Sequence, residues 1–429
     1  MAATWRRERP ATAPRSSRLR ASGSRIQEAQ PGLNIGCLRV QKWALDTQSA
    51  ANYGALRTKH RITGNVRAGG GKLRSGFGRR SLATGMTAVA AVAAVACGGS
   101  PSTGNTSSTP TIGVVLTYNL PGFWGNYLKY ESQYESQLGV KLVGPKVANV
   151  EANGNEAAQQ IIDVKALIAQ GVQALIINPA DSAAIGPALD YAKSKNIPVV
   201  TVDVAPSQGS VYMIVRADNT AYGSKSCDYI ASHASGPGTI AMVEGDLTSL
   251  NARDRASGCT SMISSKYPNF KVKSYETKDW GTDPAVQNAT TALTAISDLR
   301  GIYVHWSVPE DGIIAAEKQK SKYSDVGASN HIILVGNDGS PHECDLIRSK
   351  TLDATIDQPA DKYAYYAIFY AKEAIKGTKY SEGQKTDHNS TIVNVQGNQE
   401  DALAAPLVTL AGDNGSTQVT STDLWCNNH

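Results

Sequence analysis

Polar side chains that can bind hydroxyl groups follow several predicted strands of this sequence. Asp203 follows "PVVTV", Asp338 closes "ILVGND", and Gln358 follows "DATID". Arg253 comes shortly after the run "IAMVEG". Carboxylate, guanidinium and amide groups form directional hydrogen bonds, so this set suits a ligand that carries several hydroxyls.

Aromatic side chains occupy the same kind of position. Phe123 and Trp124 follow the first predicted strand, Trp280 follows "FKVKSYE", and Trp306 follows "IYVH". Flat indole and phenyl faces stack on the apolar C–H face of a pyranose or furanose ring. The polar and aromatic residues together predict a binding site for a small sugar or polyol.

Each of these residues also has a structural interpretation. Trp124 can be a core residue at a helix start, and Asp203 and Asp338 can be turn or cap residues. Of Arg253 and Arg255, we expect one to form a surface ion pair. The functional interpretation therefore depends on the shared position at strand ends rather than on any single residue.

Alternating strands and helices must position these side chains. Strands are predicted at 111–119, 140–145, 172–179, 197–203, 238–245, 270–276, 301–306, 331–338, 351–358 and 390–396. Helices are predicted at 123–138, 156–170, 182–196, 220–234, 283–297, 310–322, 341–349 and 361–377, with a further helix that begins near Arg253. Short connections between the two kinds of element are typical of a parallel sheet covered on both faces. The pattern restarts after "VRADNTAYG", so we predict two α/β units with ligands at the carboxyl ends of the strands.

An apolar run of small residues leads into Cys97. The stretch "GMTAVAAVAAVACGGS" (85–100) follows Arg79 and Arg80. The run is short for a bilayer-spanning helix, which needs about 20 residues, whereas a positive charge before it is typical of a signal peptide. It resembles a bacterial lipobox, so we predict a signal segment at 82–97, lipidation of Cys97 and an extracytoplasmic, membrane-anchored location. The alternative is a buried apolar helix with an incidental cysteine.

The flanking segments are not typical of a folded core. Residues 1–81 are rich in Arg, Gly, Ser and Ala, and we interpret them as a disordered leader. A translation start near Val66 or Leu73 would place much of this leader upstream of the translated protein. The formal net charge of +5 is set by the leader, and we predict no nucleic-acid partner. Residues 98–110, "GGSPSTGNTSSTP", read as a flexible linker.

The cysteine count suggests disulfides rather than a metal site. Six cysteines are present, of which Cys37 falls in the leader and Cys97 is the predicted lipid site. The others form no C-x-x-C pair, so we predict no zinc or other metal site. We also predict no cofactor. Four cysteines remain, and in a secreted protein an even number of cysteines predicts disulfides. Four cysteines would form two disulfides, with three possible connectivities. The remaining cysteines are Cys227, Cys259, Cys344 and Cys426.

Four passages carry a resemblance to a known family. They are "INPADSAAIGPALDYAKSKNIPVVTVD" (177–203), "ADNTAYG" (217–223), "ILVGNDGSP" (333–341) and "LDATIDQPA" (352–360). In this order and spacing, the chain resembles the ribose- and galactose-type periplasmic binding proteins, which are the sugar-binding subunits of ABC importers.

The resemblance implies an α/β fold of the type I periplasmic binding protein class. Two Rossmann-like lobes with parallel sheets are joined by three crossings, and the sugar is enclosed between them. The implied first lobe is 111–216 plus 359–385, the second is 217–358 plus 386–429, and the crossings lie near 216–219, 357–360 and 384–390. The implied sugar contacts are Phe123, Trp124, Asp203, Arg253 as the first arginine of an R-x-R stretch, Trp280, Asp338 and Gln358.

Departures from the family pattern bear on the ligand. The family often has Asn-Pro where this chain has Pro121 and Gly122, and Arg where it has Val204. Trp306 and Ser307 stand where the family often has Asn-Asp, and we add Trp306 to the predicted site. We therefore expect a sugar other than that of the best-known ribose receptors. The extra indole favours a flat pyranose, a substituted sugar or a cyclic polyol.

The family layout also suggests a disulfide pairing, because it places all four remaining cysteines in the second lobe. On that basis we expect the pairs Cys227–Cys259 and Cys344–Cys426.

The implied function is capture of a sugar by lobe closure and delivery to an ABC permease, by a monomer. A sensory lipoprotein that signals to a membrane receptor is the main alternative. An enzyme is disfavoured because the sequence has no G-x-S-x-G, H-E-x-x-H or P-loop motif. A sugar-responsive transcription regulator would need an N-terminal helix-turn-helix, and residues 1–80 lack its periodic helices.

Overall fold

The computed structural model describes residues 109–118, 121–148 and 155–428. The predicted leader, the signal segment with Cys97 and most of the predicted linker lie outside these residues. Within the described part of the chain, no helix is long and apolar enough to cross a membrane.

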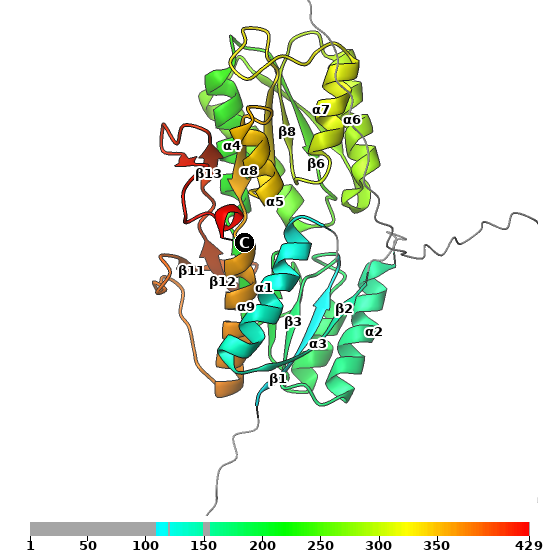
Figure 1. Cartoon of the computed structure of the whole chain (residues 1–429). Coiled ribbons are helices and arrows are strands. Elements are labelled where there is room, and N and C mark those ends of the chain that lie inside the picture. The colour runs from blue at the N-terminus through cyan, green and yellow to red at the C-terminus, as the bar shows by residue number, and fades with distance from the viewer. Residues whose placement is uncertain (1–108, 119–120, 149–154, 429) are drawn as a thin grey trace, which may run out of the picture. The chain divides into compact units, whose positions relative to one another are not determined.

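The first of two seven-stranded sheets has the order β11-β12-β5-β4-β3-β1-β2. Its strands are β1 (Thr111–Leu116), β2 (Lys141–Val147), β3 (Ala174–Ile177), β4 (Val199–Val202), β5 (Met213–Ala217), β11 (Thr391–Val395) and β12 (Asn398–Leu403). All neighbours pair in parallel except β11 with β12. The central strands are buried along their whole length, as expected for a sheet that is covered on both faces (Figure 1).

The second sheet has the order β14-β13-β10-β9-β8-β6-β7. Its strands are β6 (Thr239–Glu244), β7 (Lys271–Glu276), β8 (Leu299–Val304), β9 (Ile333–Asp338), β10 (Ala354–Asp357), β13 (Leu407–Thr409) and β14 (Thr417–Gln418). Only β10 and β13 pair antiparallel. Two mostly parallel sheets confirm the predicted α/β class.

Helices cover both faces of each sheet. Around the first sheet lie α1 (Phe123–Leu138), α2 (Glu156–Ala169), α3 (Gly186–Ser194) and α9 (Ala360–Lys376). Around the second lie α4 (Asn219–His233), α5 (Leu250–Lys266), α6 (Thr282–Ala295), α7 (Glu310–Gln319) and α8 (Pro341–Arg348). The short helices η1 (Lys278–Trp280) and η2 (Trp425–Asn427) complete the set among the described residues.

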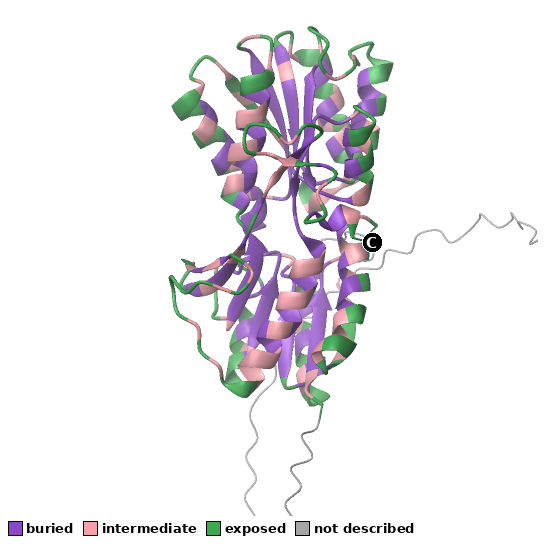
Figure 2. Cartoon of the chain, turned by 60° about the vertical axis from the view of Figure 1, so that its left-hand side comes forward, coloured by how far each residue is buried: buried purple, intermediate pink, exposed green. Residues whose placement is uncertain are grey.

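Alternation along the strands produces a core on each face. In β1, Val114 packs with residues of α1 and α9, whereas its neighbour Val115 packs with residues of α2 and α3. The second sheet is divided in the same way, with α6, α7 and α8 on one face and α4 and α5 on the other. Figure 2 shows the buried strands between helices whose outer faces are exposed. Each sheet with its helices is called a lobe below.

The chain passes between the lobes at a place that differs in part from the prediction. Strands β11 and β12 belong to the first lobe, because Glu400–Leu403 pairs in parallel with Ile214–Ala217 of β5. The predicted assignment of all of 386–429 to the second lobe is therefore corrected. The third crossing lies between β12 and β13, not at 384–390.

Both disulfides have the expected pairing. Cys227 of α4 is bonded to Cys259 of α5, with a Cα–Cα distance of 5.2 Å. Cys344 of α8 is bonded to Cys426 of η2, with a Cα–Cα distance of 6.5 Å. The first pair joins two neighbouring helices, and the second holds the C-terminal segment against the second lobe.

The C-terminal segment contacts both lobes. Trp425 is fully buried with the core residues of α1 and α9, and its Nε1 donates to the carbonyl oxygen of Asp338 at 3.1 Å. Tyr130 of α1 donates its hydroxyl to the carbonyl of Asn428 at 2.9 Å. Residues 425–428 therefore bridge α1 and the end of β9.

Candidate functional site

One pocket collects side chains from the carboxyl ends of strands in both sheets. Its empty volume is about 760 Å³, which includes space open to solvent. All of the predicted binding residues except Arg253 line it: Phe123, Trp124, Asp203, Trp280, Trp306, Asp338 and Gln358. The pocket also takes in residues that were not predicted: Tyr118, Pro121, Asn178, Asn251, Arg255 and Val308 among others.

Asp203 lies at the end of β4 on the first-lobe side of the pocket. Its backbone φ is 65°, in the left-handed region, which non-glycine residues adopt mainly at turns and functional sites. Its Oδ1 accepts from Asn251 Nδ2 at 3.1 Å and from Gln358 Nε2 at 3.0 Å. Burial raises the pKa of Asp203 to about 6, although the positive charge of Arg255 opposes the rise.

Asp338 lies at the end of β9 on the second-lobe side. Its φ is 123°, so both pocket aspartates have a positive φ. Its Oδ2 accepts from the backbone N–H of Ser307 at 3.0 Å and from the Ser307 hydroxyl at 2.6 Å, and Oδ1 takes part in neither bond. Burial raises the pKa of Asp338, and Arg255 and the Ser307 bonds counteract this effect. A carboxylate held through one oxygen can offer the other to a hydroxyl donor.

Arg255, rather than Arg253, supplies the guanidinium. It is buried on α5, where Nε donates to Asn219 Oδ1 at 2.7 Å and Nη2 donates to Gln358 Oε1 at 2.8 Å. Arg253 points elsewhere, since its Nη1 donates to the carbonyl of Leu247. The structure therefore places Arg253 outside this pocket and Arg255 in the position expected for it.

Helix periodicity explains this placement. Residues four apart share a helix face, so Asn251 and Arg255 face the pocket together, while Arg253 lies between them on another side. The sequence spacing thus shows that Asn251 and Arg255 share a face of the helix, whereas the packing of α5 against α4 decides that this face meets the pocket.

Aromatic rings come from both lobes. Phe123 and Trp124 at the start of α1 meet edge to face, with ring centroids 5.0 Å apart. Trp280 and Trp306 form a similar pair at 5.3 Å on the second lobe. The guanidinium of Arg255 lies 5.7 Å from the Trp280 ring centroid. The pocket thus offers apolar ring surfaces beside charged and amide groups.

Glycine makes room for one of these rings. A Cβ added to Gly245 would lie 2.2 Å from the Trp280 indole, which is closer than real contacts allow. Gly245 directly follows β6, so the Trp280 indole packs directly against the backbone at the end of this strand.

Two more glycines set the position of Arg255. A Cβ on Gly223 of α4 would lie 1.8 Å from the Arg255 carbonyl oxygen, and one on Gly258 of α5 would lie 2.0 Å from the Thr220 carbonyl oxygen. The two helices are therefore in backbone contact, and the Cys227–Cys259 disulfide joins the same pair. This packing fixes the end of α5 that carries Asn251 and Arg255.

Among residues 109–118, 121–148 and 155–428, no group of three or more His, Cys, Asp or Glu side chains is arranged to hold a metal ion. The pocket chemistry in this part of the chain is that of hydrogen bonding and ring stacking.

Comparisons with known proteins agree with this geometry. The family described as "Periplasmic binding protein domain" matches residues 113–379. The ribose import binding protein RbsB of Bacillus subtilis is 29% identical over 280 residues, which cover 65% of this chain and 86% of that protein. The xylitol-binding protein of Mycolicibacterium smegmatis is 26% identical, covering 68% and 78%.

A solved structure shares the fold. The periplasmic solute-binding protein of an ABC transporter from Actinobacillus succinogenes, with bound D-allose, aligns with a TM-score of 0.59 and 22% identity. The alignment covers 70% of this chain and 98% of that one. The family consists of binding proteins rather than enzymes, and its match extends over more than half of the sequence. The chain belongs to the periplasmic binding protein family, with the type I fold of two hinged α/β lobes.

Proposed function

We propose that the protein captures a sugar or related polyol outside the cytoplasm and delivers it to an ABC permease. The observation that carries the proposal is the pocket itself. Asp203 and Asp338 face it from different lobes, and Gln358 connects Asp203 to Arg255, because its Nε2 donates to Asp203 and its Oε1 accepts from Arg255. Such groups satisfy several hydroxyls at once, and an unmatched buried partner would be costly.

Relatives support this ligand class. Proteins of similar sequence are named for ribose and xylitol, and a protein of the same fold holds D-allose. The pair Trp280 and Trp306 offers two ring surfaces on one lobe, which favours a cyclic ligand with an apolar C–H face over a linear one.

Binding is proposed to proceed by lobe closure. The pocket residues come from both sheets, so a ligand that touches Asp203 and Asp338 together stabilises the arrangement in which the lobes face each other. Specificity follows because a sugar without one hydroxyl leaves a buried carboxylate or guanidinium unpaired.

The anchor is a separate part of the proposal. Lipidation of Cys97, followed by the linker 98–110, would hold the binding lobes near the membrane and its permease. Two or more acyl chains give stable membrane attachment. Mass spectrometry of the membrane-extracted protein tests this part, since an unmodified N-terminus upstream of Cys97 would contradict it.

A thermal-shift screen tests the ligand class. The panel contains D-ribose, D-allose, D-galactose, xylitol and myo-inositol. A ligand at 100 times its dissociation constant adds about 2.7 kcal/mol to the free energy of unfolding, which a melting experiment detects. A panel without any stabilising member at millimolar concentration would contradict the proposal.

The variant Asp338→Asn makes the screen specific for the pocket. The amide can still accept the Ser307 bonds through its oxygen, but it offers an N–H to the ligand where the carboxylate accepts. We expect the affinity for the stabilising polyol, measured by calorimetry, to fall about tenfold or more. The control Asp345→Asn changes an exposed α8 carboxylate that pairs with Arg348, and it should bind as the wild type does.

A further inference from the structure

Arg216 is a buried cation beside the first crossing between the lobes. It is the penultimate residue of β5, and α4 of the other lobe begins at Asn219. Only 5% of its side chain is exposed to solvent. It does not line the ligand pocket, so its burial needs another explanation.

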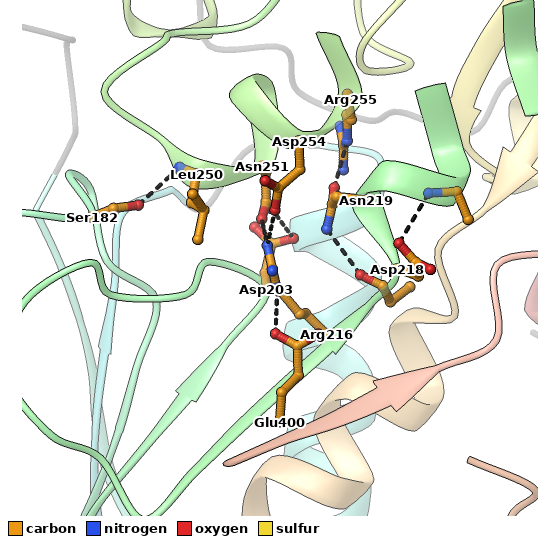
Figure 3. Close-up of polar contacts among 12 residues, drawn as sticks. Ser182, Asp203, Arg216, Asp218, Asn219, Leu250, Asn251, Asp254, Arg255 and Glu400 are labelled. Atoms are coloured by element: carbon orange, nitrogen blue, oxygen red, sulfur yellow. Dashed lines mark hydrogen bonds and ion pairs between the residues drawn. The ribbon is translucent and has the colours of Figure 1, made fainter. Parts of the chain in front are cut away.

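One side of the guanidinium is fixed within the first lobe. Arg216 Nε donates to Glu400 Oε2 at 2.5 Å, and the Glu400 side chain is 4% exposed. Glu400 lies on β12, the strand that pairs with β5. Figure 3 shows this bond, which fixes the orientation of the guanidinium.

The other side of the guanidinium reaches the second lobe. Arg216 Nη1 donates to Asp254 Oδ2 at 3.0 Å and to Asn251 Oδ1 at 3.0 Å, and both residues lie on α5 (Figure 3). Asn251 in turn donates its Nδ2 to Asp203 Oδ1. A continuous polar path therefore runs from the crossing to a pocket carboxylate.

Neutral contacts accompany this ion pair at the same end of α5. The backbone N–H of Leu250 donates to the Ser182 hydroxyl at 2.9 Å, and the Ser182 N–H donates to the Thr248 carbonyl at 3.3 Å. The first lobe thus docks on the start of α5, and Arg216 supplies the charged part of that contact.

We propose that Arg216 is a positioning residue of the binding pocket, which ties α5 to the first lobe through Asp254 and Asn251 and so favours the closed arrangement. Contacts within the protein then supply part of the free energy of lobe closure. A fraction of the ligand-free molecules is therefore already closed. The apparent dissociation constant depends on that fraction, because only the closed state offers both walls of the pocket.

The burial of the charged partners decides whether Arg216 or Asp254 should be substituted to test the proposal. Removing Arg216 would leave the buried Glu400 carboxylate without its cationic partner. An uncompensated buried charge commonly destabilises the whole fold. Asp254 is more accessible, with 25% of its side chain exposed. It lies on α5 of the second lobe, so its ion pair with Arg216 of β5 connects the two lobes. The isosteric variant Asp254→Asn therefore weakens the connection with the least damage to either lobe.

The test measures the distance between the lobes in the ligand-free, full-length protein. Spin labels are attached through a ketone-bearing non-natural residue at Ile162 of α2 and at Gln287 of α6, so the native cysteines are untouched. Ile162 is 58% exposed, and Gln287 is exposed on the other lobe. Double electron–electron resonance then gives the populations of short and long distances.

We expect the wild type to show a short-distance population and Asp254→Asn to lower its ratio to the long-distance population about tenfold, as for loss of a charged hydrogen bond. The conservative variant Asp254→Glu should restore most of it. The control Asp228→Asn removes a carboxylate whose partner, Lys266, lies in the same lobe, and it should leave the distances unchanged.

Three results would overturn the proposal: a wild type without a short-distance population, an Asp254→Asn distribution equal to that of the wild type, or an equal change in Asp228→Asn. Because no sugar is present, these outcomes are independent of the ligand class proposed above.

Discussion

At the scale of the residue, the pocket depends on side chains whose neighbours leave them little freedom. Asp203 and Asp338 each accept bonds from named donors and each has a positive φ. Residues in such backbone conformations persist only when their surroundings enforce them. The two carboxylates are therefore oriented before a ligand binds.

Gly245→Ala tests how closely the Trp280 indole is seated. The added methyl would lie 2.2 Å from the ring, so the ring must move. We expect altered tryptophan fluorescence and an affinity about tenfold or more weaker, since small displacements of a positioning group are costly. Unchanged fluorescence and affinity would show that the indole relaxes without consequence.

Arg253 and Arg255 show what sequence can and cannot predict at this scale. The residue types and their place after β6 were sufficient to predict an arginine in the pocket. Choosing between the two needs the rotation of α5, which is fixed by the backbone contact of α4 and α5 at Gly223 and Gly258. That contact involves two helices and cannot be read from either segment alone.

At the scale of the element, local periodicity was a good guide. The predicted helix at 123–138 agrees with α1, and the helix predicted at 361–377 agrees with α9 within a residue. Strand β5 was not predicted, because Arg216 interrupts its apolar run. The structure shows why a charged residue is tolerated there: its guanidinium is paired with Glu400 and Asp254.

Gly258→Ala tests the helix contact that carries Arg255. The new methyl would lie 2.0 Å from the Thr220 carbonyl oxygen, so α4 and α5 must separate. We expect a fall in the free energy of unfolding of about 1–3 kcal/mol, as for overpacked cores. The matched change Ser257→Ala adds no atoms on the exposed neighbouring position and should have little effect in the same chemical denaturation experiment.

At the scale of the whole molecule, the lobe boundaries could be predicted only in part. The first two crossings fall where strands end and helices begin, which is a local pattern. The third depends on the pairing of β12 with β5, whose residues are far apart in the sequence. The disulfide pairing was predicted from the family layout and is confirmed by the Cα–Cα distances.

Buried carboxyl groups make the stability of the molecule depend on pH. Burial raises the pKa of Glu131, on α1, from 4.5 to about 8, even though the Tyr127 hydroxyl donates to it. The folded protein therefore keeps this proton up to about pH 8, whereas the unfolded chain releases it near pH 4.5. The stabilisation is fully present below pH 4.5 and is lost as the pH rises towards 8.

Glu131→Gln should remove this dependence, because glutamine does not titrate. At pH 8.5 we expect its melting temperature to exceed that of the wild type by about 2–4 °C, and at pH 4.5 to match it closely. The exposed control Glu382→Gln should follow the wild type at both values. Equal differences at the two pH values would mean that packing, not ionisation, is responsible.

The contact of residues 425–428 with both lobes has a consequence for protein engineering. The Trp425 indole donates to the carbonyl of Asp338, and the carbonyl of Asn428 accepts from the Tyr130 hydroxyl. A version cut short before Trp425 would lose both bonds and would leave a cavity where the buried indole packs beside α1 and α9. Affinity tags are therefore better placed ahead of the first lobe.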